Sequence, residues 1–328
     1  MKRSKLLSVS VAAYNGQETL EKALSSCLVH QMDALEVIVV DDGSTDATLS
    51  IAQKFSERYP HVFKVIHQSN RGYGSTIEVA LSQASGCYFR TLDCDDWFDT
   101  EALDALLCFL GTCEADIVFT NYRTVNPGGS GQTHDVCHGR ESTGAILFDN
   151  LPPGDALDME IHAVTFRTDM LHSAQMALPH HCHYTDLLYS FIGVAAAKTL
   201  CFFSVFLYNY RLGRDGQSVS LESYQAHFED YRCVTEAILQ RTRSLPADAH
   251  GAILLSRARD IAQYGIELLL RFPISKKTKS LLLQYDKFLR MHFPAVANMM
   301  HNKNTRLLRC SHYFAYCPLC VWEKKKRS

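Results

Sequence analysis

The stretch Leu35-Glu36-Val37-Ile38-Val39-Val40-Asp41-Asp42-Gly43-Ser44 decides the fold. Its first six residues are almost wholly apolar, which is typical of a parallel strand buried on both faces. The polar residues after Val40 mark the end of that strand. Comparable strand patterns occur at 6–13, 62–67 and 87–92, and apolar residues at helical spacing predict amphipathic helices between them. This alternation predicts an α/β fold that is Rossmann-like, with a mostly parallel central sheet and flanking helices.

Polar motifs directly follow four of these predicted strands. Asn15, the pair Asp41 and Asp42, Asn70, and a cluster that begins at Asp93 each stand where a strand ends. In such sheets, ligands bind in the crevice outside the carboxyl ends of the strands. We therefore expect four loops from distant positions in the sequence to line one binding site.

The cluster Asp93-Cys94-Asp95-Asp96 places three carboxylates within four residues. Such charges repel one another, and a divalent cation removes that cost. Hard oxygen ligands at the end of a rigid strand suit Mg2+ or Mn2+ held together with substrate phosphates. The alternative is a solvated acidic turn in front of a helix predicted at 100–110, and Asp96 in particular is interpreted as a helix-capping neighbour. The position after a buried strand favours the cation site.

Three other motifs leave alternatives open. An aspartate at 41 or 42 can accept hydrogen bonds from a ribose hydroxyl or a base N–H, while residues 44–46 can cap the next helix, and both interpretations hold together. Arg71 is either a charge-assisted donor to a diphosphate or a solvent-facing arginine. The segment Pro179-His180-His181-Cys182-His183 lacks the spacing of a common structural zinc site, so it is either an acceptor-site histidine cluster or a plain loop.

Four segments, taken in order, resemble the motifs of a bacterial family 2 glycosyltransferase of the GT-A fold. They are residues 9–15, Val39-Val40-Asp41-Asp42-Gly43-Ser44-Thr45-Asp46, Asn70-Arg71-Gly72, and Leu92-Asp93-Cys94-Asp95-Asp96-Trp97. The resemblance in order, spacing and strand-end context covers about the first 110 residues. Only the combination is specific, because no single piece is.

The resemblance implies which residues bind the donor nucleotide and a metal. Asp95 and Asp93 would ligate Mn2+ or Mg2+, and Asp42 would hold the base or the ribose. The remaining donor-binding residues would be Ala12, Ala13, Tyr14, Asn15, Asn70, Arg71, Asp93, Cys94 and Arg211, with Arg214 as the alternative to Arg211. Ala12 departs from the family form, which has proline there, and contacts made by the backbone should survive that change.

The resemblance also implies a general base, which usually lies in a Glu-Asp pair. Here Thr185 replaces the glutamate and Asp186 remains, so Asp186 is the predicted catalytic base for the acceptor hydroxyl. The alternative for Asp186 is a carboxylate that only stabilises a helix N-terminus. The Gln-x-x-Arg-Trp motif of processive synthases is missing, which favours the addition of a single sugar.

The pattern changes to helical after residue 218. Residues 1–218 would form the GT-A domain, with a nucleotide-binding half up to about 122 and an acceptor half from about 123. Residues 219–328 would form a helical C-terminal region, with helices at 221–243, 247–271 and 275–292. The longest apolar run, at 191–208, contains Lys198 and is interpreted as a buried strand and not as a membrane span.

Composition and the tail bear on location and partners. The net charge of −2 argues against a nucleic-acid partner, and twelve scattered cysteines favour reduced thiols in the cytoplasm. Cys310, His312, Cys317 and Cys320 fit a zinc knuckle only loosely. The apolar residues of 307–322 and the basic run after Glu323 fit two interpretations, both left open: peripheral contact with the anionic inner face of the plasma membrane, or a packed terminal helix with a solvated end.

These observations together predict an inverting, metal-dependent transferase. It would move a sugar from a nucleoside-diphosphate sugar, of the UDP type by family habit, to a hydroxyl of a glycan or lipid-linked glycan in cell-surface glycan synthesis. The alternatives are a nucleotidyltransferase and a catalytically silent module that binds nucleotide-sugars. The first loop lacks the lysine expected of a nucleotidyltransferase, and the intact Asp93, Asp95 and Asp186 speak against a silent module.

Overall fold

The structure is a computed structural model that describes residues 5–126, 133–142, 144–152, 157–213 and 217–325. These residues divide into two compact units, one that runs to residue 213, and a second that begins at residue 217. Each unit is described by itself below. Arg214, the alternative donor contact, lies outside the described residues.

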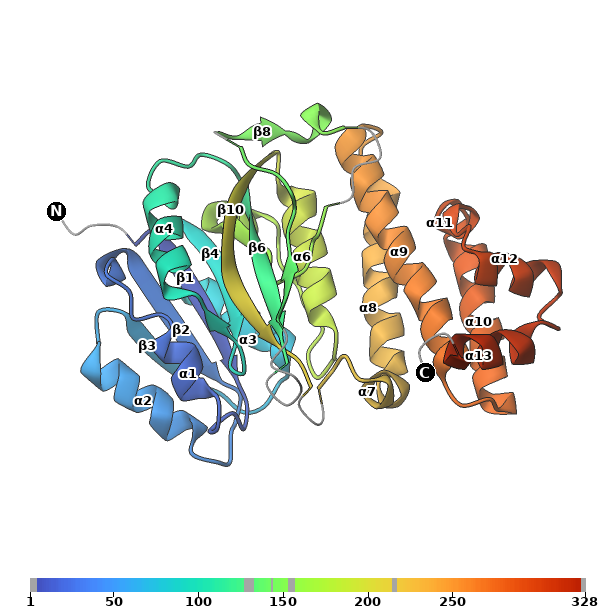
Figure 1. Cartoon of the computed structure of the whole chain (residues 1–328), viewed down its shortest axis with the longest axis horizontal. Coiled ribbons are helices and arrows are strands. Elements are labelled where there is room, and N and C mark those ends of the chain that lie inside the picture. The colour runs from blue at the N-terminus through green and yellow to red at the C-terminus, as the bar shows by residue number, and fades with distance from the viewer. Residues whose placement is uncertain (1–4, 127–132, 143, 153–156, 214–216, 326–328) are drawn as a thin grey trace. The chain divides into compact units, whose positions relative to one another are not determined.

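The first unit alternates strands and helices, as its sequence predicts (Figure 1). Its elements are β1 (Leu7–Ala13), α1 (Leu20–Ser25), β2 (Leu35–Asp41), α2 (Thr48–Arg58), β3 (Phe63–His67), α3 (Tyr73–Gln83), β4 (Tyr88–Asp93), β5 (Trp97–Phe98), α4 (Thr100–Leu110), β6 (Ile117–Val125), β7 (Thr133–Val136), β8 (Ile146–Leu147), β9 (Val164–Arg167), α5 (Thr168–Ser173), α6 (Thr185–Ala196) and β10 (Thr199–Arg211).

The strands of this unit form one sheet in the order β3-β2-β1-β4-β9-β6-β10-β5, with β7 and β8 beside β6 and β10. β1 is parallel to β2 and β4, β2 is parallel to β3, and β6 is parallel to β10. Only β9 interrupts this central run, because it is antiparallel to both β4 and β6. The N-terminal end of β9 therefore lies at the edge where β4 ends.

The packing of helices against the sheet explains why the sequence of β2 is a continuous apolar run. Helices α1, α2 and α4 pack with β1 and β2 in one cluster, whereas α3, α5 and α6 contact one another and α3 covers β1 and β2 (Figure 1). Every residue of β2 is buried, because layers of helices cover the sheet on both sides. The predicted α/β architecture is confirmed.

The apolar run at 191–208 is not one strand. Its first part is the end of α6, and β10 begins only at Thr199. A short apolar run does not distinguish a buried helix from a buried strand by periodicity, and the alanines at 195–197 are good helix formers. In the described part of the chain, no helix is both long and apolar enough to cross a membrane.

The described part of the second unit contains helices and their connections but no strand, as predicted, although the helix predicted at 221–243 is divided into two shorter helices. Its helices are α7 (Leu221–Ala226), α8 (Phe228–Arg241), α9 (Ala249–Arg271), α10 (Lys276–His292), α11 (Pro294–Met299), α12 (Lys303–Cys310) and α13 (Tyr316–Lys325). α9 is the longest, and α8, α10, α11 and α13 pack against it (Figure 1). Asp248 caps α9 by accepting a hydrogen bond from the Gly251 N–H at 2.8 Å.

Candidate active site at the carboxyl edge of the sheet

The loops after β1 and β2 are joined by hydrogen bonds. The Asn15 N–H donates to Ser44 Oγ at 2.9 Å, and the Asn15 side-chain oxygen accepts from the Thr45 N–H at 2.9 Å. Asn15 has a φ of 48°, a left-handed conformation that asparagine tolerates better than most residues. Asn15 therefore fixes the shape of this edge of the sheet through both its backbone and its side chain.

Asp42 organises the loop that follows β3. Its Oδ1 accepts hydrogen bonds from the Arg71 N–H at 2.9 Å and from Gln68 Nε2 at 2.6 Å. Its Oδ2 accepts from the Gly72 N–H at 2.8 Å. Only 3% of Asp42 is exposed. The sequence predicts that this carboxylate contacts the base or the ribose, but in the structure it accepts hydrogen bonds from the Arg71 loop.

Asp93 lies where the predicted groups meet. It ends β4 in register with Ala12 of β1, and its Oδ1 accepts a hydrogen bond from the Tyr73 hydroxyl at 2.6 Å. Burial, followed by the negative charges of Asp95 and Asp186, raises the pKa of Asp93 to about 7 despite the bond from Tyr73. Asp95 and Asp186 are thus close enough to Asp93 to act on its charge.

Asp96 is not a helix cap. That role belongs to Asp99, which accepts a hydrogen bond from the Ala102 N–H at 3.0 Å at the start of α4. Asp96 is 1% exposed and accepts from the Tyr208 hydroxyl at 2.7 Å and from the Arg211 N–H at 2.7 Å. Burial and the neighbouring Asp93 and Asp95 raise its pKa well above the usual range. The helix-capping interpretation of Asp96 is wrong, because both of its carboxylate oxygens accept hydrogen bonds from residues of β10.

Asp186 lies in the first turn of α6. The residue before that helix, Tyr184, has a φ of 64°, a strained conformation for a bulky side chain. Thr185 is fully buried, and a Cβ on Gly74 of α3 would lie 3.3 Å from its Oγ1. Thr185, the position where the resemblance implies a glutamate, therefore packs inside, while the half-buried Asp186 lies within electrostatic range of Asp93.

Two cations lie against the ring of Trp97, the residue that directly follows the acidic cluster. Arg211 Nε donates to the Asp95 carbonyl at 2.9 Å, and its guanidinium lies 5.4 Å from the centre of the Trp97 ring. Lys22 Nζ lies 3.0 Å from the centre of the same ring. Burial and the positive charge of Arg211 lower the pKa of Lys22. Lys22 was not singled out from the sequence, because a lysine on a surface helix carries no local signal.

His162 is a second residue that the sequence did not indicate. It precedes β9, its ring stacks on Tyr210 at 4.1 Å between ring centres, and its carbonyl accepts a hydrogen bond from the buried Arg90. Burial and the charge of Arg90 lower the pKa of His162 to about 4, so its ring is neutral near pH 7. One ligand atom each from Asp93, Asp96 and His162 lies within 4.8 Å of the others. Asp95 is not in that grouping.

The other predicted residues differ in their burial and in their contacts. Ala13 is buried beside Asp41, Tyr14 is 53% exposed, and Asn70 is exposed. Cys94 packs so closely on Gly16 that a Cβ there would lie 2.8 Å from its Sγ. His180 bonds to Glu78 at 2.9 Å. In the second unit, Cys310, His312, Cys317 and Cys320 form no grouping of ligand atoms within the described residues.

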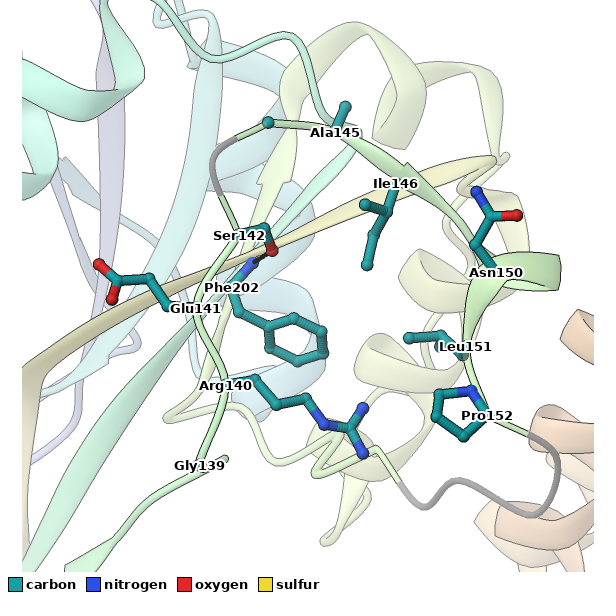
Figure 2. A pocket seen from close by; sticks show the side chains of 11 residues that line it. Gly139, Arg140, Glu141, Ser142, Ala145, Ile146, Asn150, Leu151, Pro152 and Phe202 are labelled. Atoms are coloured by element: carbon teal, nitrogen blue, oxygen red, sulfur yellow. Dashed lines mark hydrogen bonds between the residues drawn. The ribbon is translucent and has the colours of Figure 1, made fainter.

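A cavity of about 710 Å³ lies elsewhere in the first unit, beside β8 (Figure 2). Arg140, Ser142, Ile146, Asn150 and Phe202 line it, and the Arg140 guanidinium lies 5.2 Å from the centre of the Phe202 ring. Phe202 stands near the start of β10, whereas Arg211 ends that strand at the acidic cluster. At about 3.3 Å per residue, roughly 30 Å separates the two places. The cavity is therefore not part of the candidate active site.

Comparison with known families identifies the domain. The sequence model of the family described as "Glycosyl transferase family 2" matches residues 8–172, half of the chain. The chain belongs to glycosyltransferase family 2. This confirms the resemblance seen in the sequence and the class of enzyme it implies. The match includes the Asp93 cluster but ends before Asp186 and Arg211, so it does not reach the predicted base or the predicted diphosphate contact.

Individual relatives agree with this assignment. The putative glycosyltransferase EpsH of Bacillus subtilis is 27% identical over 215 residues, which cover 63% of this chain and 60% of EpsH. A crystal structure of S. aureus TarS 1–349 in complex with UDP-GlcNAc has a TM-score of 0.71 at 21% identity and covers 98% of this chain and 91% of that one. The mannosyltransferase PcManGT of Pyrobaculum calidifontis, solved with GDP-Man and Mn2+, has a TM-score of 0.50 at 14% identity, with coverage of 98% and 87%. At these identities the two structures show a shared fold.

Proposed function

We propose that this protein transfers a single sugar from a UDP-sugar to an acceptor hydroxyl of a glycan or lipid-linked glycan, with inversion at the anomeric carbon. One observation carries the proposal: Asp93, Asp95, Asp96 and Asp186 come together at the carboxyl edge of a family 2 sheet, and Arg211 and Lys22 lie against the ring of Trp97, which directly follows Asp96. Burial, and after it the negative charges of Asp95 and Asp186, raise the pKa of Asp93. A site that unites this acidic cluster with two cations suits a diphosphate held by a metal.

The donor set fits a divalent cation. Asp93 and Asp96 offer carboxylate oxygens, and His162 offers a ring nitrogen within 4.8 Å of them. A neutral imidazole can ligate a metal, and its low pKa keeps His162 in that form. Asp95, the ligand implied by the family, adds its negative charge to the same place. We infer that Asp93, Asp95, Asp96 and His162 would hold Mn2+ or Mg2+, which would neutralise charge on the departing diphosphate.

Other residues of the chain would activate the acceptor and bind the donor. Asp186 would accept the proton of the acceptor hydroxyl, which then attacks the anomeric carbon from the face opposite the leaving group and inverts it. Lys22 and Arg211 would attract the diphosphate, and the Asn15 and Arg71 loops would hold the nucleoside. Asp42 would act through the Arg71 loop, because both of its oxygens accept hydrogen bonds from that loop.

The UDP-sugar is favoured because TarS, whose fold this chain shares, was solved with UDP-GlcNAc. A nucleotidyltransferase is disfavoured by the match to a glycosyltransferase family. The silent module is the remaining rival, and it predicts nucleotide binding without turnover. An assay must therefore measure binding and bond cleavage separately.

The test combines thermal stabilisation with release of UDP. A ligand that binds only the folded state raises its melting temperature, so UDP with Mn2+ should stabilise the protein and EDTA should remove that effect. A set of UDP-sugars should then yield one that releases UDP when Mn2+ is present. Asp95→Asn should weaken Mn2+-dependent stabilisation and lower UDP release, while Asp135→Asn, a change of an exposed carboxylate on β7, should alter neither. Absence of stabilisation by UDP would refute the proposal, and binding without release would identify the silent module.

A further inference from the structure

The last part of the second unit differs in charge from the rest of the chain. Residues 272–328 contain twelve Lys and Arg and only two acidic residues, whereas the whole chain contains 33 and 35. A strong local excess of positive charge in a chain with a net charge of −2 points to a negatively charged partner for this segment.

Both acidic residues of this segment are internal. Asp286 on α10 is 1% exposed and is bound by Arg309 of α12 at 2.6 Å and by the Tyr313 hydroxyl. Glu323 is buried and accepts a hydrogen bond from Asn304 Nδ2 at 2.7 Å. Among the described residues from 272 onward, no exposed carboxylate therefore offsets the exposed lysines and arginines.

The same segment exposes large apolar side chains. Seven of the ten that are exposed in the described chain lie there, and they are Ile274, Leu283, Met291, Leu307, Phe314, Val321 and Trp322. Phe314 is 84% exposed, and Trp322 is 44% exposed. Single apolar residues on a surface need no explanation, but a gathering of them marks an interaction site.

Exposed cationic and apolar side chains lie on α12, on α13 and on the turn between them. Lys303, Arg306 and Leu307 stand at helical spacing and are exposed, whereas Leu308 beside them is buried. Lys303 Nζ lies 6.0 Å from the centre of the Trp322 ring, which joins this side of α12 to α13. We call Lys303, Arg306, Leu307, Phe314, Val321 and Trp322 the aromatic-basic surface.

We propose that the aromatic-basic surface binds an anionic lipid bilayer. Lysine and arginine are attracted to acidic headgroups, and phenylalanine, tryptophan and leucine bury their apolar parts at the boundary with the acyl chains. Trp322 beside Lys303 offers both kinds of contact in one place. A soluble polyanion would satisfy the cations but would leave Phe314 and Trp322 in water, which is why the bilayer is the better partner. Leu308, Tyr316 and Leu319 are buried, so this region packs as a folded corner and presents only its outer side.

The first experiment measures binding of the full chain to vesicles. It should sediment with vesicles of phosphatidylcholine and phosphatidylglycerol, and much less with phosphatidylcholine alone, and salt should weaken the binding. Each cation near an anionic surface contributes about 1 kcal/mol, so Lys303→Gln with Arg306→Gln should weaken binding roughly tenfold or more. Phe314→Ser with Trp322→Ser should have a comparable effect. Because all four side chains are exposed, the melting temperature should change little.

Matched controls come from the first unit. Lys54→Gln with Arg58→Gln removes two exposed cations from α2, and Leu147→Ser removes an exposed apolar side chain from β8. Both variants should bind the acidic vesicles as the unchanged protein does. Equal binding to vesicles with and without phosphatidylglycerol would overturn the proposal. Binding that depends on the cations but not on Phe314 and Trp322 would also overturn it and would identify a surface for a soluble polyanion.

The second experiment measures whether the Trp322 ring inserts into the lipid bilayer. The chain has two tryptophans, so Trp97→Phe leaves Trp322 as the sole indole fluorophore. Acidic vesicles should shift its emission to shorter wavelength, and brominated lipids should quench it, since the ring enters the interface. Emission that stays unchanged while the protein sediments would show that the surface does not insert, and the proposed mode of binding would fall.

Discussion

The backbone N–H of His181 donates a hydrogen bond to the carbonyl oxygen of Arg71 at 2.7 Å. This bond joins the loop after β3, on the proposed donor side, to the loop before α6, whose first turn carries Asp186. Gly72 makes the approach possible, because a Cβ at this position would lie 2.9 Å from the His181 nitrogen. The two halves of the candidate site are therefore held in one arrangement by contacts between backbones.

Gly72→Ala should separate these loops. Gly72 has a φ of 87° and a ψ of 167°, a conformation that is essentially restricted to glycine, so alanine there costs about 1–3 kcal/mol in addition to the collision with His181. Gly139→Ala is the matched control, because Gly139 has a φ of 63° but nothing lies within 4 Å of its added Cβ. Both variants should lose stability in urea denaturation, and only Gly72→Ala should lower UDP release by about tenfold or more, as expected for misplaced groups. Equal activity of the two variants would contradict the coupling of the loops.

Asp186→Asn should block proton transfer and leave donor binding intact. A positioned general base contributes about 10²–10⁴-fold, so kcat for UDP release should fall by that factor. The Kd of UDP with Mn2+, measured by calorimetry, should stay within about twofold. Asp169→Asn changes an exposed carboxylate in the first turn of α5 and serves as the control. A helix-stabilising carboxylate would give the opposite result, namely a lower melting temperature with unchanged kcat.

Tyr208→Phe should loosen the acidic turn. The Tyr208 hydroxyl donates to Asp96 at 2.7 Å and accepts from the Asp93 N–H at 3.1 Å, so its loss leaves two buried groups without this partner. The free energy of unfolding should fall by about 1–3 kcal/mol. Tyr88→Phe removes a buried hydroxyl that bonds to the carbonyls of Cys113 and Ala115 at the other end of β4, and it should cost similar stability. Only Tyr208→Phe should raise the Mn2+ concentration needed for UDP binding, which a titration would measure.

Much of this site could be predicted from local sequence. Asn15, Asp42, Arg71 and Asp93 lie at or shortly after the ends of strands, and the topology of a parallel sheet brings those ends to one edge. The role of Asp42 was not predictable, because no local pattern shows that its oxygens accept hydrogen bonds from the Arg71 and Gly72 amides.

His162, Tyr208 and Lys22 required the three-dimensional structure. His162 reaches Asp93 because β9 pairs antiparallel with β4, a long-range pairing for which a four-residue strand gives no sequence signal. Tyr208 reaches Asp96 because β10 pairs with β5. The alternation in Tyr208-Asn209-Tyr210 indicates that the two tyrosines share a face of the strand, but it does not say which face meets the acidic turn.

Glu36 should make the stability of the first unit depend on acid pH. Burial by itself raises the pKa of this β2 carboxylate, but hydrogen bonds from Lys64 at 2.5 Å, from the Ser85 N–H at 2.9 Å and from Ser8 Oγ at 2.7 Å outweigh burial and lower it. A carboxyl whose pKa is lower in the folded than in the unfolded state stabilises the fold above its unfolded pKa of about 4.3. That contribution is lost as the pH falls from there through the lowered pKa of the folded state.

Glu36→Gln should remove this part of the pH dependence. At neutral pH the variant should be less stable by about 1–3 kcal/mol, because an amide cannot accept from all the donors that surround Glu36. Between about pH 5 and pH 3 its free energy of unfolding, measured with urea, should fall less steeply than that of the unchanged protein. Glu57→Gln alters an exposed carboxylate on α2 and should keep the original slope. Parallel curves for Glu36→Gln and the unchanged protein would mean that the hydrogen bonds to Glu36 do not lower its pKa, since a group with equal pKa values in the folded and unfolded states adds no slope.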